Sequence, residues 1–116
     1  MKIALSTTGR EPGSDVDARF GRAAWFLIHD TDERSWQAIE NKSNVEAPHG
    51  AGVEAAKLVG HHGVSAVITG SCGPKAFQVL AAGKIRVYRG DGRSVATAVK
   101  AFEEGRLPEI REGSGQ

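Results

Sequence analysis

A single cysteine, Cys72, is the residue in this sequence best suited to chemistry. It lies directly before Gly73-Pro74, and proline is favoured at the first position of a helix. A thiol beside a helix N-terminus has a lowered pKa, and the resulting thiolate binds soft metals or attacks electrophiles. The alternative is that Cys72 is a small buried apolar residue. The sequence leaves both interpretations open.

His49 is a second candidate ligand because it precedes the glycines that begin another expected helix. No Cys-x-x-Cys or paired-histidine spacing accompanies it, so a closed structural zinc site is not predicted. His61 and His62 fall at the expected end of the same helix, where a positive charge is favourable, and we interpret them as structural.

Several enzyme motifs can be tested against the sequence. Residues 50–55, Gly-Ala-Gly-Val-Glu-Ala, match a dinucleotide-binding pattern, but no acidic residue follows at the required distance. Phosphate-loop, cysteine-phosphatase and serine-hydrolase motifs do not occur. A thiol enzyme based on Cys72 would need a base, and His49 is the one nearby candidate. We therefore expect a protein that is not an enzyme.

The elements that position these residues follow from the apolar pattern. Short apolar runs predict strands at 2–6, 25–30, 36–41, 64–69 and 84–88, and wider spacing predicts helices at 50–62, 74–83 and 94–105. The order β-β-β-α-β-α-β-α indicates an α/β fold with a mixed five-stranded sheet and helices on both faces. We expect the second and third strands to form a hairpin at an antiparallel edge, the run at 64–69 to be buried on both faces, and Ser94 to cap the third helix. We expect one domain over residues 1–106 and a polar tail over 107–116.

In an open α/β sheet, ligands bind beyond the carboxyl ends of the parallel strands. The segments 7–15, 48–52, 70–73 and 89–93 are expected at that edge, together with three helix N-termini. Helix N-termini favour anions. Arginines lie in or near these segments: Arg10, Arg19, Arg22, Arg89 and Arg93. We therefore predict one binding site for an anionic ligand along this edge.

Composition excludes other classes of function. The 116 residues are 40% hydrophobic with a formal net charge of +1, which fits a small globular domain and gives no basic field for nucleic acid. The apolar runs are too short to span a membrane. One cysteine suits a reducing compartment, so we expect a cytoplasmic protein.

Four segments in order carry a family resemblance. They are Ser-Asp-Val-Asp-Ala-Arg-Phe-Gly-Arg-Ala at 14–23, Phe-Leu-Ile-His-Asp at 26–30, His-Gly-Ala-Gly at 49–52 and Gly-Ser-Cys-Gly-Pro-Lys-Ala at 70–76. A fifth, Gly-Lys-Ile-Arg-Val-Tyr at 83–88, matches less cleanly because of one insertion. Over about residues 2–106 the chain resembles the dinitrogenase iron-molybdenum cofactor biosynthesis family, small nitrogenase accessory domains that carry metal clusters.

The resemblance implies a ribonuclease H-like fold and binding of an anionic iron-sulfur or molybdenum-containing cluster, for delivery or storage in place of catalysis. A cluster donor or acceptor protein would then be the partner. The alternative is a regulatory module that binds a small molecule or nucleotide at the same edge. The residues carried over are Arg19, Phe20, Gly21, Arg22, His49, Gly50, Gly52, Gly70 and Gly73 as cofactor-binding residues, with Cys72 and His49 as metal ligands.

Overall fold

The computed structural model describes residues 1–41 and 50–113. Its elements are β1 (Lys2–Thr7), β2 (Trp25–Asp30), β3 (Ser35–Glu40), α2 (Ala51–Gly60), β4 (Ala66–Thr69), α3 (Pro74–Ala82), β5 (Arg86–Arg89), α4 (Val95–Glu103) and β6 (Glu109–Ile110). In the described part of the chain, no helix is long and apolar enough to cross a membrane.

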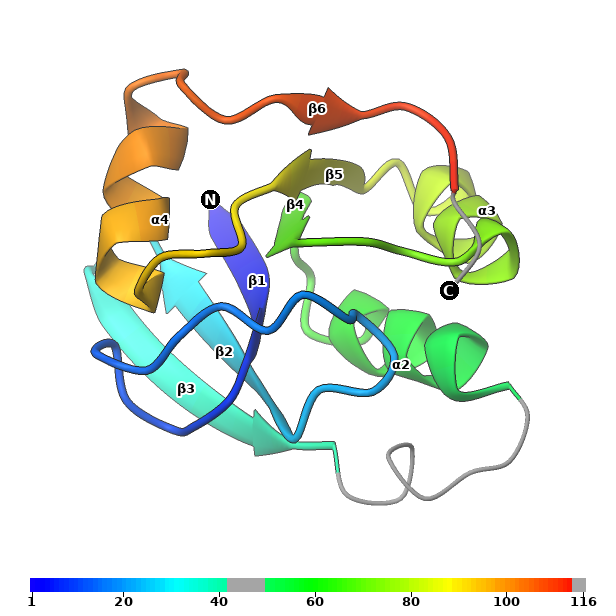
Figure 1. Cartoon of the computed structure of the whole chain (residues 1–116), viewed down its shortest axis with the longest axis horizontal. Coiled ribbons are helices and arrows are strands. Elements are labelled where there is room, and N and C mark those ends of the chain that lie inside the picture. The colour runs from blue at the N-terminus through cyan, green and yellow to red at the C-terminus, as the bar shows by residue number, and fades with distance from the viewer. Residues whose placement is uncertain (42–49, 114–116) are drawn as a thin grey trace.

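One mixed sheet runs through the molecule in the strand order β3-β2-β1-β4-β5-β6 (Figure 1). The pairs β1–β2 and β2–β3 are antiparallel, which confirms the predicted hairpin and edge. The pairs β1–β4 and β4–β5 are parallel, as expected for strands joined through helices. The parallel strands β1, β4 and β5 therefore end at the same edge of the sheet.

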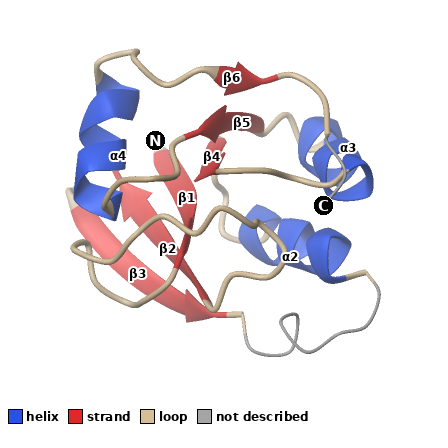
Figure 2. Ribbon diagram, viewed as in Figure 1, coloured by secondary structure: helices blue, strands red, loops and turns tan. Residues whose placement is uncertain are grey.

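Helices cover both faces of the sheet, as the pattern predicted (Figure 2). Buried residues of α2 and α3 form one hydrophobic cluster with one face of the sheet, and buried residues of α4 form a second cluster with the other face. All four residues of β4 are buried. The near-continuous apolar run at 64–69 is typical of a strand covered on both sides.

Within the part of the chain that the structure describes, the sheet has six strands and not the five that we predicted. β6 has two residues, and it pairs antiparallel with β5 through Val87↔Ile110 and Tyr88↔Glu109. Leu107 belongs to the α4 cluster, and Ile110 packs against the cluster on the opposite face. These two apolar side chains hold a segment that we had placed in the polar tail. A two-residue strand between Pro108 and Arg111 has no alternating pattern, so the sequence does not reveal it. The α/β class is established, and the ribonuclease H-like assignment stays a prediction.

Candidate functional site

A long loop, residues 8–22, crosses the carboxyl ends of the parallel strands. We call it the crossing loop; Figure 1 shows it running from the side of α4 to the side of α2. Backbone bridges hold it at Thr7↔Val16, Asp15↔Ser94 and Arg19↔Ser71. Near its far end, the Phe20 amide donates to the Ser71 carbonyl at 3.1 Å, and the Ser71 amide donates to the Ala18 carbonyl at 2.7 Å. The segment around Arg19 is therefore fixed beside the segment that precedes α3.

Two buried hydroxyl groups anchor the middle of the crossing loop. The Ser6 hydroxyl, at the end of β1, donates to the Asp17 carbonyl at 2.7 Å and lies 2.7 Å from the Thr69 hydroxyl at the end of β4. The Asp17 carboxylate then accepts a hydrogen bond from the Arg19 amide at 2.8 Å. Buried polar groups that are paired in this way favour a single loop conformation.

Three of the predicted glycines serve close contacts within the protein. A Cβ atom on Gly21 would lie 2.7 Å from the Gly52 Cα in the first turn of α2, and one on Gly70 would lie 2.6 Å from the Ala18 Cα. A Cβ on Gly52 would lie 3.1 Å from the Ala76 Cβ of α3. We expected glycine to admit a ligand; at these positions it admits the protein's own backbone and brings the crossing loop, α2 and α3 together.

No side chain among residues 1–41 and 50–113 caps the N-terminus of α2 or of α3. Gly50 precedes α2 in the left-handed region at φ 76°, and Gly73 precedes α3 in an extended conformation. The amides of residues 51–53 in α2 and of residues 75 and 76 in α3 donate to no acceptor among the described residues. Unpaired first-turn amides and the helix dipole give both ends a partial positive charge.

A pocket of about 340 Å³ lies between these two helix ends, and we call it the helix-end pocket. It is lined by Gly50, Gly52, Val53, Gly73, Pro74, Lys75 and Ala76. Lys75 is the one charged residue in this lining, among the residues described. Sequence analysis missed Lys75 and Val53 as site residues, although their positions in the first turns after Gly73-Pro74 and Gly50 would have indicated both.

Arg19 and Arg22, two of the predicted arginines, lie on a segment that packs beside this pocket. Arg19 is bridged to Ser71, two residues before Gly73, and its side chain is 64% exposed. Arg22 follows Gly21, which contacts the backbone of Gly52. His49 lies outside the described residues. The structure thus brings Arg19, Gly21, Arg22, Gly50, Gly52, Gly70 and Gly73 into one region.

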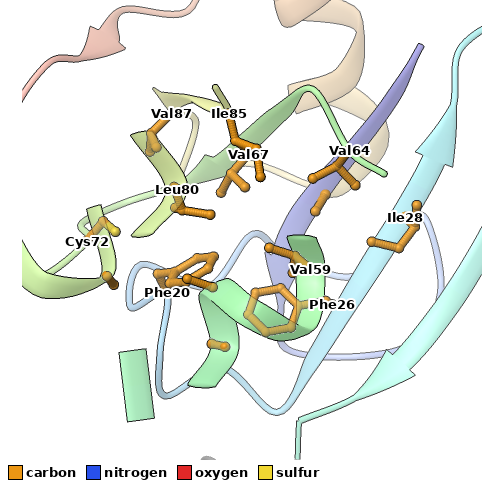
Figure 3. Packing of buried hydrophobic residues seen from close by; sticks show 14 residues of the cluster. Phe20, Phe26, Ile28, Val59, Val64, Val67, Cys72, Leu80, Ile85 and Val87 are labelled. Carbon is orange, nitrogen blue, oxygen red and sulfur yellow. The ribbon is translucent and has the colours of Figure 1, made fainter. Parts of the chain in front are cut away.

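Phe20 and Cys72 belong to the hydrophobic core beneath this region (Figure 3). The Phe20 ring is 1% exposed and lies 5.2 Å from the Phe26 ring. Cys72 is fully buried, and burial raises the pKa of its thiol to about 11. Of the two interpretations that the sequence left open for Cys72, the lowered pKa is therefore wrong in sign, because loss of solvation outweighs the nearby helix end. A neutral, buried thiol is a poor nucleophile at physiological pH.

The N-terminus of α4, which we also expected at the site, is capped instead. The Ser94 hydroxyl accepts a hydrogen bond from the Thr97 amide at 3.2 Å. The crossing loop supplies two further acceptors, because the Ser14 carbonyl takes the Val95 amide and the Pro12 carbonyl takes the Ala96 amide. Of the three helix N-termini predicted at this edge, the described residues therefore leave two open and close the third.

Three other arginines lie away from the helix-end pocket. Arg10 lies over the Trp25 ring at 5.2 Å from its centroid, and Arg89 pairs with Asp91 at 3.2 Å. Arg93 lines a separate cavity of about 430 Å³ between the crossing loop and the segment before α4. The arginines that we predicted along one edge are therefore not gathered at a single site.

Comparisons with known proteins identify the family and agree with the fold. A model of the dinitrogenase iron-molybdenum cofactor family matches residues 1–105. An uncharacterised protein of Methanocaldococcus jannaschii is 33% identical over 92% of this chain and 89% of its own length. The apo form of the orange protein from Desulfovibrio gigas superimposes with a TM-score of 0.94 at 35% identity, covering 98% of this chain and 96% of that one. A putative NifB protein from Thermotoga gives 0.86 at 33% identity, covering 99% and 97%. The chain belongs to the dinitrogenase iron-molybdenum cofactor family.

Proposed function

We propose that the helix-end pocket binds an anionic iron-sulfur or molybdenum-containing cluster as cargo, which the protein stores or delivers without chemical conversion. The observation that carries this proposal is the convergence of two uncapped helix ends on one pocket of about 340 Å³. Their amides are unpaired within the described chain and need an acceptor. Sulfide and oxo atoms of an anionic cluster are such acceptors.

Cationic side chains would add to the attraction. Lys75 lines the pocket, and Arg19 stands on the adjoining segment with most of its side chain in solvent. A hydrogen bond to a charged partner contributes about 1.5–3 kcal/mol. Several such contacts retain an anion without a covalent bond, and an exposed pocket allows it to be released again. Release is what a carrier requires of its site.

The cysteine is not needed in this scheme. Cys72 would have to leave the core and lose a proton whose pKa is about 11 before it could bind a metal. His49 directly precedes Gly50 in the sequence and stays a proposed ligand. The family to which the chain belongs is named for the iron-molybdenum cofactor, and the similar orange protein was solved in an apo form, a description used for proteins that bind a ligand. We propose a cluster donor or acceptor protein as the partner.

Anaerobic uptake tests the proposal. Purified protein is mixed with soluble molybdenum-sulfide or iron-sulfide anions, desalted, and measured for retained metal, sulfide and visible absorption. Lys75→Glu should weaken retention by about 10-fold or more, because it replaces an attractive charge by a repulsive one. Lys100→Glu is the matched control, since Lys100 is exposed on α4 and away from the pocket. Absence of uptake, or equal loss in both variants, would refute the proposal.

Nucleotides serve as the competing ligand class, because phosphate oxygens also accept hydrogen bonds from helix ends. A nucleotide present at 100 times its dissociation constant would stabilise the fold by about 2.7 kcal/mol, which a thermal shift detects. We expect a shift with the metal-sulfide anion and none with nucleotides. The reverse result would favour a nucleotide-binding regulatory module.

A further inference from the structure

The two edges of the sheet are protected to very different degrees. At one edge, β6 has two residues and lies beside charged side chains, which are common ways to prevent unwanted strand pairing. At the other edge, β3 has six residues and pairs along its whole length with β2. Its outer side pairs with no described strand. β3 contains no lysine, proline or glycine, and Glu40 is its one charged residue.

The side chains of β3 hold this edge in place. The Trp36 ring lies 4.0 Å from the ring of buried His29, on the face covered by α4. Ile39 is half-buried against the cluster on the opposite face. Because side chains on both faces of β3 pack against a hydrophobic cluster, its backbone is fixed in an extended conformation that another strand can pair with.

We propose that β3 pairs antiparallel with β3 of a second copy of this chain, about a two-fold axis at Gln37. A two-fold axis perpendicular to the sheet does not exchange the two faces of the sheet. Residues that lie opposite one another must then point to the same face, so the axis must pass through a residue position and not between two residues. An axis at Gln37 places Trp36 opposite the partner's Ala38. It also brings Arg34, which lies in the turn directly before β3 at φ 58°, next to Glu40 of the partner subunit.

Charge complementarity selects this register. An axis one residue along, at Ala38, would put Trp36 opposite the partner's Glu40 and would leave Arg34 without an acidic partner. Arg34 already holds Glu103 through a single guanidinium nitrogen, at 3.0 Å to the nearer carboxylate oxygen. Its other nitrogens make no hydrogen bond to described residues and stay available to the partner's Glu40. Opposite charges that face one another across strands stabilise pairing, and like charges oppose it.

The expected dimer is weak, because one pair of six-residue strands buries less surface than a standard stable interface. Sedimentation equilibrium of the cluster-free protein, from micromolar to millimolar concentration, should therefore show a reversible monomer–dimer equilibrium. Gln37→Lys places two positive charges face to face and should weaken the dimer about 10-fold or more. Gln78→Lys is the matched control, because it adds the same charge at an exposed position on α3.

The register has its own test. Glu40→Arg and Arg34→Glu should each weaken the homodimer, because each puts like charges opposite one another. A mixture of the two variants should restore dimers, since all facing pairs are then opposite in charge. Thermal unfolding of each monomer checks that the variants are folded. The proposal is overturned by a protein that stays monomeric at every concentration, by a dimer that Gln37→Lys leaves unchanged, or by a mixture that stays monomeric. Failure here would leave the cluster-binding proposal intact, because the edge and the pocket involve different residues.

Discussion

The N-terminus of α4 and the N-termini of α2 and α3 lie at the same edge of the sheet but differ in how their amides are satisfied. At α4, a serine hydroxyl and two carbonyls of the crossing loop accept the first-turn hydrogen bonds. At α2 and α3, glycine occupies the cap position and no described group accepts them. A closed end stabilises the fold, whereas an open end leaves donors for a ligand.

The difference is produced by the crossing loop. Its early part covers the start of α4 and accepts hydrogen bonds from the first-turn amides there. Its later part contacts the backbone of α2 at Gly21 but accepts no hydrogen bond from the first-turn amides of α2 and α3. One loop therefore both closes the site on one side and builds it on the other.

Closing the open end of α3 should have the largest effect. Gly73 has an extended conformation and open space at its Cβ position, so Gly73→Asp would cap the helix without strain. We expect slightly higher stability, by a few tenths of a kcal/mol, and about 100-fold weaker cluster binding, because a carboxylate then takes the amides and repels the anion. Uptake titration and thermal melting measure both. The neutral cap Gly73→Asn is the control and should lose less affinity; equal binding by all three proteins would contradict the account.

Removing the contact between the crossing loop and α2 should come next. Gly21→Ala puts a methyl group 2.7 Å from backbone atoms that cannot move aside easily. We expect a loss of about 1–3 kcal/mol in the free energy of unfolding, measured by urea denaturation. Gly13→Ala lies in the same loop with nothing within 4 Å and should be nearly neutral. If both variants were equally stable, the close approach would not determine the position of the loop.

The pH dependence of stability tests the burial of Cys72. Its folded pKa of about 11 exceeds the ordinary value of 9.0, so folding favours the protonated thiol. This contribution is complete below pH 9 and is lost as the pH rises from about 9 to about 11, to a total of roughly 3 kcal/mol. In Cys72→Ala, the free energy of unfolding should lack this part of the decline with pH, as measured by urea denaturation at a series of pH values. If the free energy of unfolding of Cys72→Ala fell with pH as steeply as that of the native protein, the thiol would ionise freely in the folded state.

Opening the closed end should have the smallest effect. Ser94→Ala removes the side-chain acceptor for the Thr97 amide and should cost about 1 kcal/mol of stability. Cluster retention should be unchanged, because the crossing-loop carbonyls still occupy the neighbouring amides. Parallel melting and uptake measurements distinguish the two effects. Weaker cluster binding in this variant would place the site at α4 instead.

Much of the fold follows from local pattern. The hairpin of β2 and β3, the buried strand β4, the start of α3 at Pro74 and the capping role of Ser94 were all predicted, with element ends that differ by at most two residues. These features depend on side-chain periodicity and on the preferences of proline and serine, which act over a few residues. β6 was not predicted because it has no local sequence pattern. Tertiary contacts of Leu107 and Ile110 position it instead.

The site was only partly predictable for the same reason. The sequence indicated the glycines, Arg19 and Arg22, and the structure brings their segments together. It did not reveal that the crossing loop closes α4, because that depends on carbonyls of Pro12 and Ser14, some 80 residues before the amides they accept. The sequence left two interpretations of Cys72 open because burial, which raises the pKa of its thiol, is a property of the whole fold.

The central claim is that an anion binds at the open helix ends and not at the closed one. Titration of isotope-labelled protein with a diamagnetic molybdenum-sulfide anion, followed by amide chemical shifts, tests this residue by residue. The account predicts the largest shifts at Ala51–Val53, Lys75 and Ala76, with Val95 and Ala96 unmoved. Shifts centred on Val95 and Ala96, or none at the open ends under saturating anion, would contradict it.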